Sequence, residues 1–397
     1  MSDQQDKLKL ESLSETLNRL ARKGLSISET AEQRAQLVAI ASGFNSISVP
    51  ALEKLLPAMQ DVGDYSSRWI LAKMMRDAAL QDPSSAATVI DALYNGFAKT
   101  GDAGSRQMSS GLFRDIGAAQ EDSAVRAASA LSQLLEQERD TSAKISEKNA
   151  LMTLGLKYES TAPMAVCAIA AAMLKEPSPG FRIQLASDLR VLGLKYQSQA
   201  NAVVKQLAKA AASETDGLTS QNIAQGISEV AMSYPFAVPA ALETLAEGFK
   251  ATKDITAISG YARAMTAIGQ SHPAAALNAM SQLLEDGMNK DQRRMLFIGL
   301  SSIAELGGVP TSAAATVLGN ALFKEEDPFN RRLVIDGLMT AARNGNDEGD
   351  KVKETLKKQL SQEKDPETHK HLTKNLRSLG YVKPFVPNVV SFQPKTA

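Results

Sequence analysis

A five-residue sequence, Leu-Gly-Leu-Lys-Tyr, occurs twice in this chain, at residues 154–158 and again, after a 38-residue step, at 192–196. The same step continues in both directions, because small residues stand at Ala79, Gly117, Gly155, Gly193, Ala231, Gly269, Gly307 and Gly345. A fixed period of this length over most of a chain is typical of stacked structural repeats. Each repeat of such an array contacts only its neighbours, so the 397 residues favour one repeat array over several independent domains.

Within each period, apolar residues recur at helical spacing. They stand one and four residues before the small reference residue, and small or apolar residues return seven, 11 and 14 residues after it. In the repeat around Gly155 these residues are Leu151, Leu154, Ala162, Val166 and Ile169. Steps of three and four residues place side chains on one face of an α-helix. Each period therefore predicts two amphipathic helices of roughly 13–16 residues, joined by short turns.

Glycines and prolines mark the ends of these helices. Glycine at the reference position suits a left-handed C-cap, which a residue without a Cβ adopts at no steric cost. Prolines such as Pro163 and Pro273 follow within a few residues, where they can begin the next helix. The pattern predicts an all-α fold, a right-handed α-solenoid of about nine two-helix repeats with a 38-residue period. We expect an N-terminal capping helix in residues 1–27, the repeat array in 28–380 and an extended tail in 381–397.

The charge and hydropathy of the chain argue against two classes of partner. Lys and Arg together number 44, as do Asp and Glu, so the net charge is zero. Nucleic-acid binding relies on a basic surface, which makes nucleic acid a poor candidate partner. The longest apolar run, residues 162–174, is shorter than the ~20 residues that span a bilayer. The polar N-terminus does not resemble a secretory signal, so we expect a cytoplasmic protein; secretion without a signal peptide is left open.

The sequence gives little support for catalysis. The histidines are His272, His369 and His371, and the last two stand two residues apart, so they point to different faces of a helix. The usual metal-binding, nucleophile and nucleotide-binding motifs do not occur. Cys167 is the only cysteine, which excludes an internal disulfide and Cys-based zinc sites. It lies on an apolar stripe, where we expect an inert core thiol. We expect no catalytic residue, no metal site and no cofactor.

Several of the expected first helices resemble HEAT and armadillo-type repeats. Residues 291–294 (Asp-Gln-Arg-Arg) lead into 304–307 (Ala-Glu-Leu-Gly), and residues 327–332 (Asp-Pro-Phe-Asn-Arg-Arg) lead into Leu338. Tetratricopeptide repeats have a shorter period, roughly 34 residues, and are the second choice. The resemblance covers about residues 28–380 at the level of architecture. It implies that the helices ending at the reference residue form the inner, concave layer, where partners of HEAT-like arrays usually bind.

Six arginines occupy two recurring positions of this helix. Arg68, Arg106 and Arg182 stand eleven residues before the reference position, and Arg76, Arg114 and Arg190 stand three residues before it. A rigid, forked guanidinium suits carboxylate or phosphate groups, which indicates a groove for an acidic peptide, a phosphate-bearing ligand or nucleic acid. The alternative is an internal ladder, in which acidic residues such as Asp77 and Asp115 neutralise the arginines.

Aromatic residues offer further candidates. Trp69 follows Arg68 and could anchor a partner, or it could fill the core beneath the N-terminal cap. Tyr158 and Tyr196 occupy equivalent turns, where they could contact a partner or pack against helix ends.

These observations predict a non-catalytic interaction scaffold that binds another protein or an acidic peptide along the inner helical layer. The predicted contact residues are Arg68, Trp69, Arg76, Arg106, Arg114, Arg182 and Arg190. Two other classes stay open: a nucleic-acid-binding HEAT-like protein, and a lyase or ligand-handling enzyme on the same fold.

Overall fold

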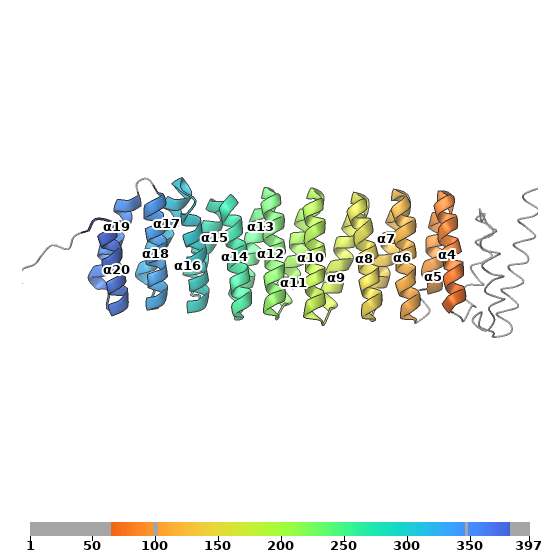
Figure 1. The fold of residues 1–397 in the computed structure, drawn as a ribbon, viewed down its shortest axis with the longest axis horizontal. Helices are drawn as coiled ribbons and strands as arrows, with labels where there is room; N and C mark the ends of the chain where they lie inside the picture. The colour runs from red at the N-terminus through yellow and green to blue at the C-terminus, as the bar shows by residue number, and fades with distance from the viewer. Residues whose placement is uncertain (1–64, 98–101, 346–347, 382–397) are drawn as a thin grey trace, which may run out of the picture. The chain divides into compact units, whose positions relative to one another are not determined.

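Every element of regular structure in residues 65–97, 102–345 and 348–381 is helical, and these ranges are the ones that the computed structural model describes. They contain 17 α-helices and four short 3-10 turns (Figure 1). The all-α prediction is therefore confirmed. The contacts divide the chain into two compact units, Met1–Ala210 and Ala211–Ala397. The predicted cap in 1–27 and the tail beyond 381 lie outside the described residues.

In the unit Met1–Ala210, helices alternate between two layers. The first helix of each pair belongs to one layer: α4 (Tyr65–Gln81), α6 (Ala103–Ala119), α8 (Thr141–Lys157) and α10 (Pro179–Lys195). The second helices are α5 (Ala86–Phe97), α7 (Glu121–Gln137) and α9 (Ala162–Lys175), with α11 (Ala200–Ser213) after α10. Helix α6 contacts α4 and α8 in one layer, and α7 contacts α5 and α9 in the other.

The unit Ala211–Ala397 has the same organisation. Its first helices are α12 (Gly217–Ser233), α14 (Ile255–Ser271), α16 (Lys290–Ala304), α18 (Pro328–Asn344) and α20 (Pro366–Ser378). Its second helices are α13 (Val238–Ala251), α15 (Pro273–Glu285), α17 (Gly308–Lys324) and α19 (Glu348–Gln362). Contacts again join α12 to α14 and α14 to α16 in one layer, and α13 to α15 and α15 to α17 in the other. Each unit is thus a stack of two-helix repeats.

A second periodic signal sets where the first helices begin. A side-chain oxygen just before each helix accepts a backbone N–H of its first turn, which caps the helix. These caps are Asp102, Asp140, Ser178, Asp216, Asp254, Asn289, Asp327 and Asp365. They follow the 38-residue period except between Asp254 and Asn289, where the step is shorter. Pro163 and Pro273 stand at helix starts, as predicted, and Pro328 and Pro366 also begin helices.

The predicted role of the reference glycines is wrong in most repeats. Gly117, Gly155 and Gly269 lie inside the last turns of α6, α8 and α14 and lack a positive φ. A Cβ on Gly117 would lie 2.8 Å from the Cβ of Ala127, and one on Gly155 2.9 Å from the Cβ of Ala165. These glycines therefore allow the two helices of a pair to approach closely. Gly307 is the exception, with a φ of 82°, because α16 ends early at Ala304.

Small residues line the seam between the two layers. Ala124, Ala127 and Ala128 on α7 are fully buried. The prediction that Cys167 lies in the core is wrong, since this cysteine is exposed on α9. It directly follows the buried Val166, and one residue along a helix turns the side chain by about 100°. None of the helices in the described ranges is long and apolar enough to cross a membrane.

Candidate functional site

Buried ion pairs connect the first helices at their N-terminal ends. A basic residue four positions after one cap pairs with a glutamate two positions before the next cap along the chain. The pairs are Arg106–Glu138, Lys144–Glu176, Arg293–Glu325 and Arg331–Glu363. Each of these carboxylates also accepts a backbone N–H from the turn before the following helix. Such compensation is what a buried carboxylate needs to remain charged.

These four ion pairs form a ladder along the first helices. The pKa of Glu138 shows how burial and hydrogen bonding compete in this ladder. Burial alone would raise the pKa of the Glu138 carboxyl. Hydrogen bonds from Arg106 and from the backbone N–H groups of Asp140 and Arg139 outweigh burial and hold this pKa below its ordinary value. Arg106, one of the six predicted contact arginines, is therefore engaged inside the chain. The recurrence of Glu138, Glu176, Glu325 and Glu363 before the caps was the sequence signal that could have revealed the ladder.

The other predicted arginines lie at several places on the first helices. The Arg182 Nη1 donates to the backbone oxygens of Glu176 and Pro177 at 3.0 and 2.9 Å. The Arg190 Nη2 lies 3.4 Å from the Ser187 Oγ on the same helix, α10. The side chain of Arg68 lies outside the described part of the structure.

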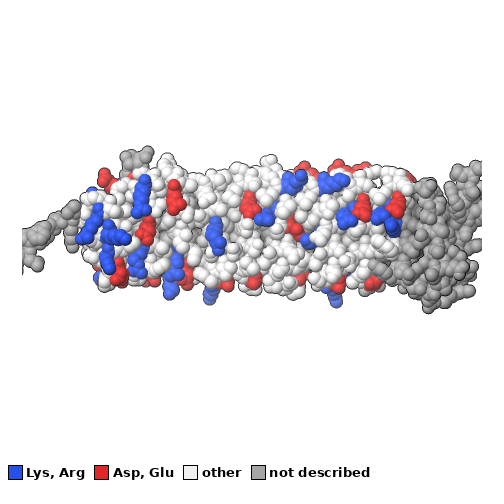
Figure 2. Space-filling model, viewed as in Figure 1, with Lys and Arg blue, Asp and Glu red and all other residues white. Residues whose placement is uncertain are grey.

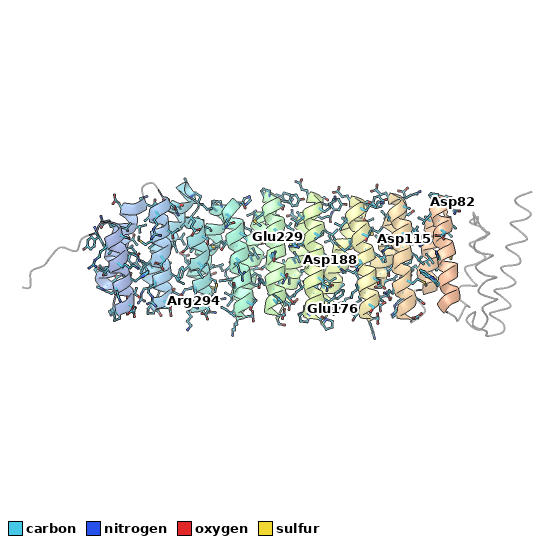
Figure 3. The ribbon with its side chains drawn as sticks, viewed as in Figure 1. Asp82, Asp115, Glu176, Asp188, Glu229 and Arg294 are labelled. Atoms are coloured by element: carbon cyan, nitrogen blue, oxygen red, sulfur yellow. The ribbon has the colours of Figure 1, made fainter. Side chains whose placement is uncertain are left out.

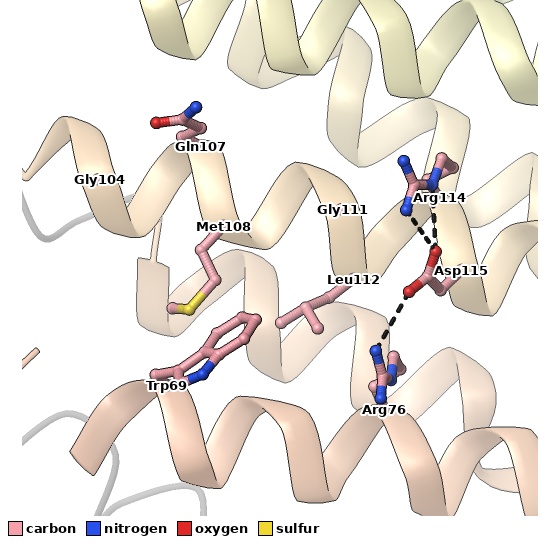
Figure 4. A pocket seen from close by; sticks show the side chains of 9 residues that line it. All are labelled: Trp69, Arg76, Gly104, Gln107, Met108, Gly111, Leu112, Arg114 and Asp115. Atoms are coloured by element: carbon pink, nitrogen blue, oxygen red, sulfur yellow. Dashed lines mark hydrogen bonds and ion pairs between the residues drawn. The ribbon is translucent and has the colours of Figure 1, made fainter. Parts of the chain in front are cut away.

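The structure brings Trp69, Arg76 and Arg114 together in one hollow between α4 and α6 (Figure 4). Its volume is about 460 Å³, and Met108 and Leu112 of α6 form its apolar side. Trp69 is 41% exposed in this hollow, and the N-terminal cap, beneath which its alternative role would lie, is outside the described residues. A tryptophan, a methionine and a leucine thus line a surface opening beside two arginines.

A single carboxylate connects the two arginines of the hollow. Asp115 accepts from the Arg76 Nη1 at 3.2 Å and from the Arg114 Nη2 at 2.8 Å (Figure 4). Arg76 also pairs with Asp77 at 2.6 Å. Arg114 is nearly half exposed and directs only its Nε and Nη2 at Asp115, which leaves the Nη1 donors toward solvent. The predicted pairing of these arginines with Asp77 and Asp115 is present, and it coexists with an accessible guanidinium edge.

A further ion pair joins two helices of this layer. Lys148 of α8 contacts Asp188 of α10 at 2.7 Å. Asp115 and Asp188 lie part-way along their helices, whereas Glu176 lies near the N-terminal end of α10 (Figure 3). Over α4, α6 and α8 most of the face is uncharged, and basic side chains lie next to acidic ones (Figure 2).

The two tyrosines of the repeated sequence close helix ends. The Tyr158 hydroxyl donates to the backbone oxygen of Ala118 at 3.0 Å, and that of Tyr196 to the backbone oxygen of Leu156 at 2.9 Å. Each ring therefore packs at the C-terminal end of the preceding first helix, whose last carbonyl groups lack intrahelical partners. This arrangement corresponds to the helix-end role among the two predicted for these residues.

Comparisons with known proteins give distant structural similarities and no family. No family model matches the chain, and no curated protein matches it. Among solved structures, it is similar to an engineered protein, Northeast Structural Genomics Consortium target OR497, with 16% identity and a TM-score of 0.35. That match covers 92% of this chain and 99% of the engineered chain. It is also similar to Kap121p, with 10% identity and a TM-score of 0.49, over 92% of this chain and 41% of Kap121p.

The arrangement of the helix pairs identifies the architecture. Two layers of antiparallel helices, tied by contacts between successive first helices and between successive second helices, recur in both units. Each unit has a HEAT-like fold. This α-helical repeat fold typically presents binding surfaces rather than catalytic centres. In the described residues, no cluster of three His, Cys, Asp or Glu side chains is placed to hold a metal ion.

Proposed function

We propose that this protein is a non-catalytic interaction scaffold that binds an acidic segment of a partner protein in the hollow between α4 and α6. The observation that carries the proposal is the meeting of Trp69, Arg76 and Arg114 beside Met108 and Leu112 in one surface opening. Tryptophan and arginine are enriched among the residues that dominate binding energies at protein interfaces. An exposed guanidinium edge matches the geometry of a carboxylate.

In this proposal Trp69 and Met108 receive an apolar side chain of the partner, and Arg114 receives a neighbouring carboxylate. Arg182 and Arg190 would extend the same surface along α10, and Arg68 would extend it along α4. Arg106, which pairs with Glu138, would hold α6 in place for binding. The proposal also places the protein in the cytoplasm, where a lone cysteine stays reduced.

The test uses short fluorescein-labelled peptides and the full chain. An acidic peptide with one central leucine is titrated against the wild type, and anisotropy reports the Kd. Trp69→Ala and Arg114→Glu should each weaken binding by about tenfold or more, because each removes a central contact. Arg139→Glu, an exposed arginine in the turn before α8, is the matched charge control and should leave the Kd nearly unchanged.

A variant of Asp115 distinguishes a binding site from a purely structural ladder more sharply. This carboxylate occupies both arginines, so a bound peptide carboxylate has to compete with it. Asp115→Asn should therefore strengthen binding of the acidic peptide, whereas a purely structural ladder would predict no gain. Equal affinity across all variants, or a preference for a lysine-bearing peptide, would refute the proposed site. Circular dichroism verifies that each variant retains its helices.

A further inference from the structure

A second groove lies on the layer of second helices in the unit Ala211–Ala397, between α13 and α15. Its volume is about 620 Å³. Small and apolar side chains line it from both helices: Pro239, Leu242 and Ala246 from α13, and Ala275, Ala279 and Leu283 from α15. The lining positions run from Pro239 to Lys250 along α13, which is about 17 Å at the helical rise per residue. Three turns of a third helix have the same length.

The charges that line this groove are unbalanced. The carboxylates are Glu243, Glu247, Glu285 and Asp286, and Lys250 is the only cation among the described lining residues, so four negative charges meet one positive charge. Lys250 pairs with Asp286, and this pair closes one end of the groove. Glu243, Glu247 and Glu285 are exposed, and none of them forms an ion pair with a residue in the described ranges.

The repeat itself shows which cation is missing. In the other unit, Asp91 of α5 pairs with Arg126 of α7 across the same layer. Four repeat periods later, Asp91 corresponds to Glu243 and Arg126 corresponds to Asn278, and both of these line the groove. The acidic residue is thus kept while its internal cation is replaced by an amide.

We infer that this groove binds a positively charged amphipathic helix of a partner protein. Lysine or arginine side chains of that helix pair with Glu243, Glu247 and Glu285, and its small or apolar face lies on the alanine-rich floor. Small floor residues allow two helices to approach closely, and helix-in-groove binding uses this combination of an apolar floor with a charged rim. The site differs from the hollow between α4 and α6 in unit, layer and sign of charge, so it does not rest on the function proposed above.

The experiment measures fluorescence anisotropy of a labelled helical peptide about three turns long, with alanine and leucine on one face and lysine on its flanks. The full chain should bind it at physiological salt. A peptide with glutamate in place of lysine, and a scrambled peptide of the same composition without an apolar face, should bind at least about tenfold more weakly. Equal binding of the scrambled peptide would overturn the inference, because it would indicate a nonspecific attraction between charges.

Two variants of the protein test the location. Glu243→Gln combined with Glu247→Gln should weaken binding by about tenfold or more, while Glu305→Gln combined with Glu354→Gln, exposed glutamates outside the groove, should change it less than about twofold. Asn278→Arg restores the cation that α7 carries as Arg126, so it should pair with Glu243 and also weaken binding without disturbing the fold. Unchanged affinity in both groove variants would overturn the assignment. Trp69→Ala should leave this peptide's affinity intact, which separates the two sites.

Discussion

Two glycines of α6, six residues apart, differ in the space that a side chain would find there. A Cβ on Gly117 would meet Ala127 at 2.8 Å and Leu154 at 3.1 Å, whereas a Cβ on Gly111 has no other atom within 4 Å. We predict that Gly117→Ala destabilises the protein by about 1–3 kcal/mol, because overpacking forces the helices apart. Gly111→Ala should stabilise it by about 0.5–1 kcal/mol through the lower entropy of the unfolded chain. Thermal unfolding of the two variants measures both effects.

The two substitutions add the same methyl group to the same helix, so each serves as the control for the other. A loss of stability of similar size in both would mean that the close approach of α6 and α7 does not decide the outcome, because a Cβ on Gly111 meets no neighbouring element within 4 Å.

Glu147 of α8 is a buried acid at a position where most other repeats carry an apolar residue. It is fully buried, and the equivalent residues seven positions after their caps include Leu185 and Leu296. Burial raises the pKa of Glu147 to about 8; the charge of Glu138 acts in the same direction, and that of Arg106 in the opposite one. Asp140 is a further nearby negative charge. Glu147 is therefore mainly protonated at neutral pH in the folded protein.

This shift makes folding stability depend on pH in a defined window. Below pH 4.5 the group is protonated in both states and contributes nothing. Between 4.5 and about 8 only the folded state holds the proton, so the free energy of unfolding falls as pH rises, by up to about 1.4 kcal/mol per pH unit. We predict that Glu147→Gln gains stability over the wild type progressively from pH 5 to 8, with a constant difference above that.

Denaturant unfolding at a series of pH values measures this difference. Taking the difference between variant and wild type removes the contribution of ladder carboxylates that do not act on Glu147, such as Glu363, whose lowered pKa affects stability at acidic pH. Glu136→Gln, at an exposed glutamate, is the control and should show no such trend. A pH-independent difference for Glu147→Gln would show that this carboxyl is ionised in the folded protein.

At the scale of the helices, the ladder of buried ion pairs predicts a contrast between adjacent glutamates. Glu325 has a side chain only 1% exposed, pairs with Arg293 and accepts the Asp327 N–H, whereas Glu326 is exposed. Glu325→Ala should cost about 3 kcal/mol, because the Arg293 charge and a backbone donor lose their partner. Glu326→Ala should stay within about 0.5 kcal/mol of the wild type. Calorimetry of the two variants gives the comparison, and similar effects would mean that the ladder adds no stability.

The helices could be predicted from the sequence, but the way they contact one another could not. Spacings of three and four residues identified both helices of each repeat, and prolines identified where several begin. Gly117 and Gly155 were assigned to left-handed caps because a glycine near a helix end looks the same in sequence whether it ends the helix or admits a neighbouring one. Which surface approaches Gly117 depends on Ala127, and no helical periodicity encodes that contact.

The candidate site was only partly predictable for the same reason. Arg76 and Arg114 were selected because they recur at one position of the repeat period, and Trp69 was selected because it follows Arg68; the hollow contains all three. The internal ladder was one of the two alternatives for Arg106, but its partner was not foreseen, because Glu138 belongs to the turn before the next helix and not to the same helix face. The reference residue Gly307 keeps the 38-residue step, whereas the cap before α16 does not, so only the shorter step from Asp254 to Asn289 marks the earlier start of α16 at Lys290.

At the scale of the whole molecule, a net charge of zero results from local groups of opposite sign. The hollow between α4 and α6 presents arginines, and the groove between α13 and α15 presents carboxylates. The charges of these two surfaces together contribute little to the net charge of the chain. The net charge therefore carries little information on either surface. A repeat fold makes this separation possible, because each surface needs only the residues of two neighbouring repeats.

The same nearest-neighbour design predicts how damage spreads along the chain. In each unit, contacts join a helix only to its own pair and to the adjacent repeats. A destabilised repeat should therefore open locally without a matching loss elsewhere. In hydrogen exchange measured by mass spectrometry, Glu325→Ala should speed exchange in α16, α17 and α18 and leave α6, α7 and α8 at their wild-type rates. Gly117→Ala should give the reverse pattern, and each variant is the control for the other. A uniform rise in exchange over all described helices in either variant would mean that the chain unfolds as one cooperative body, since only long-range coupling could carry a local defect so far.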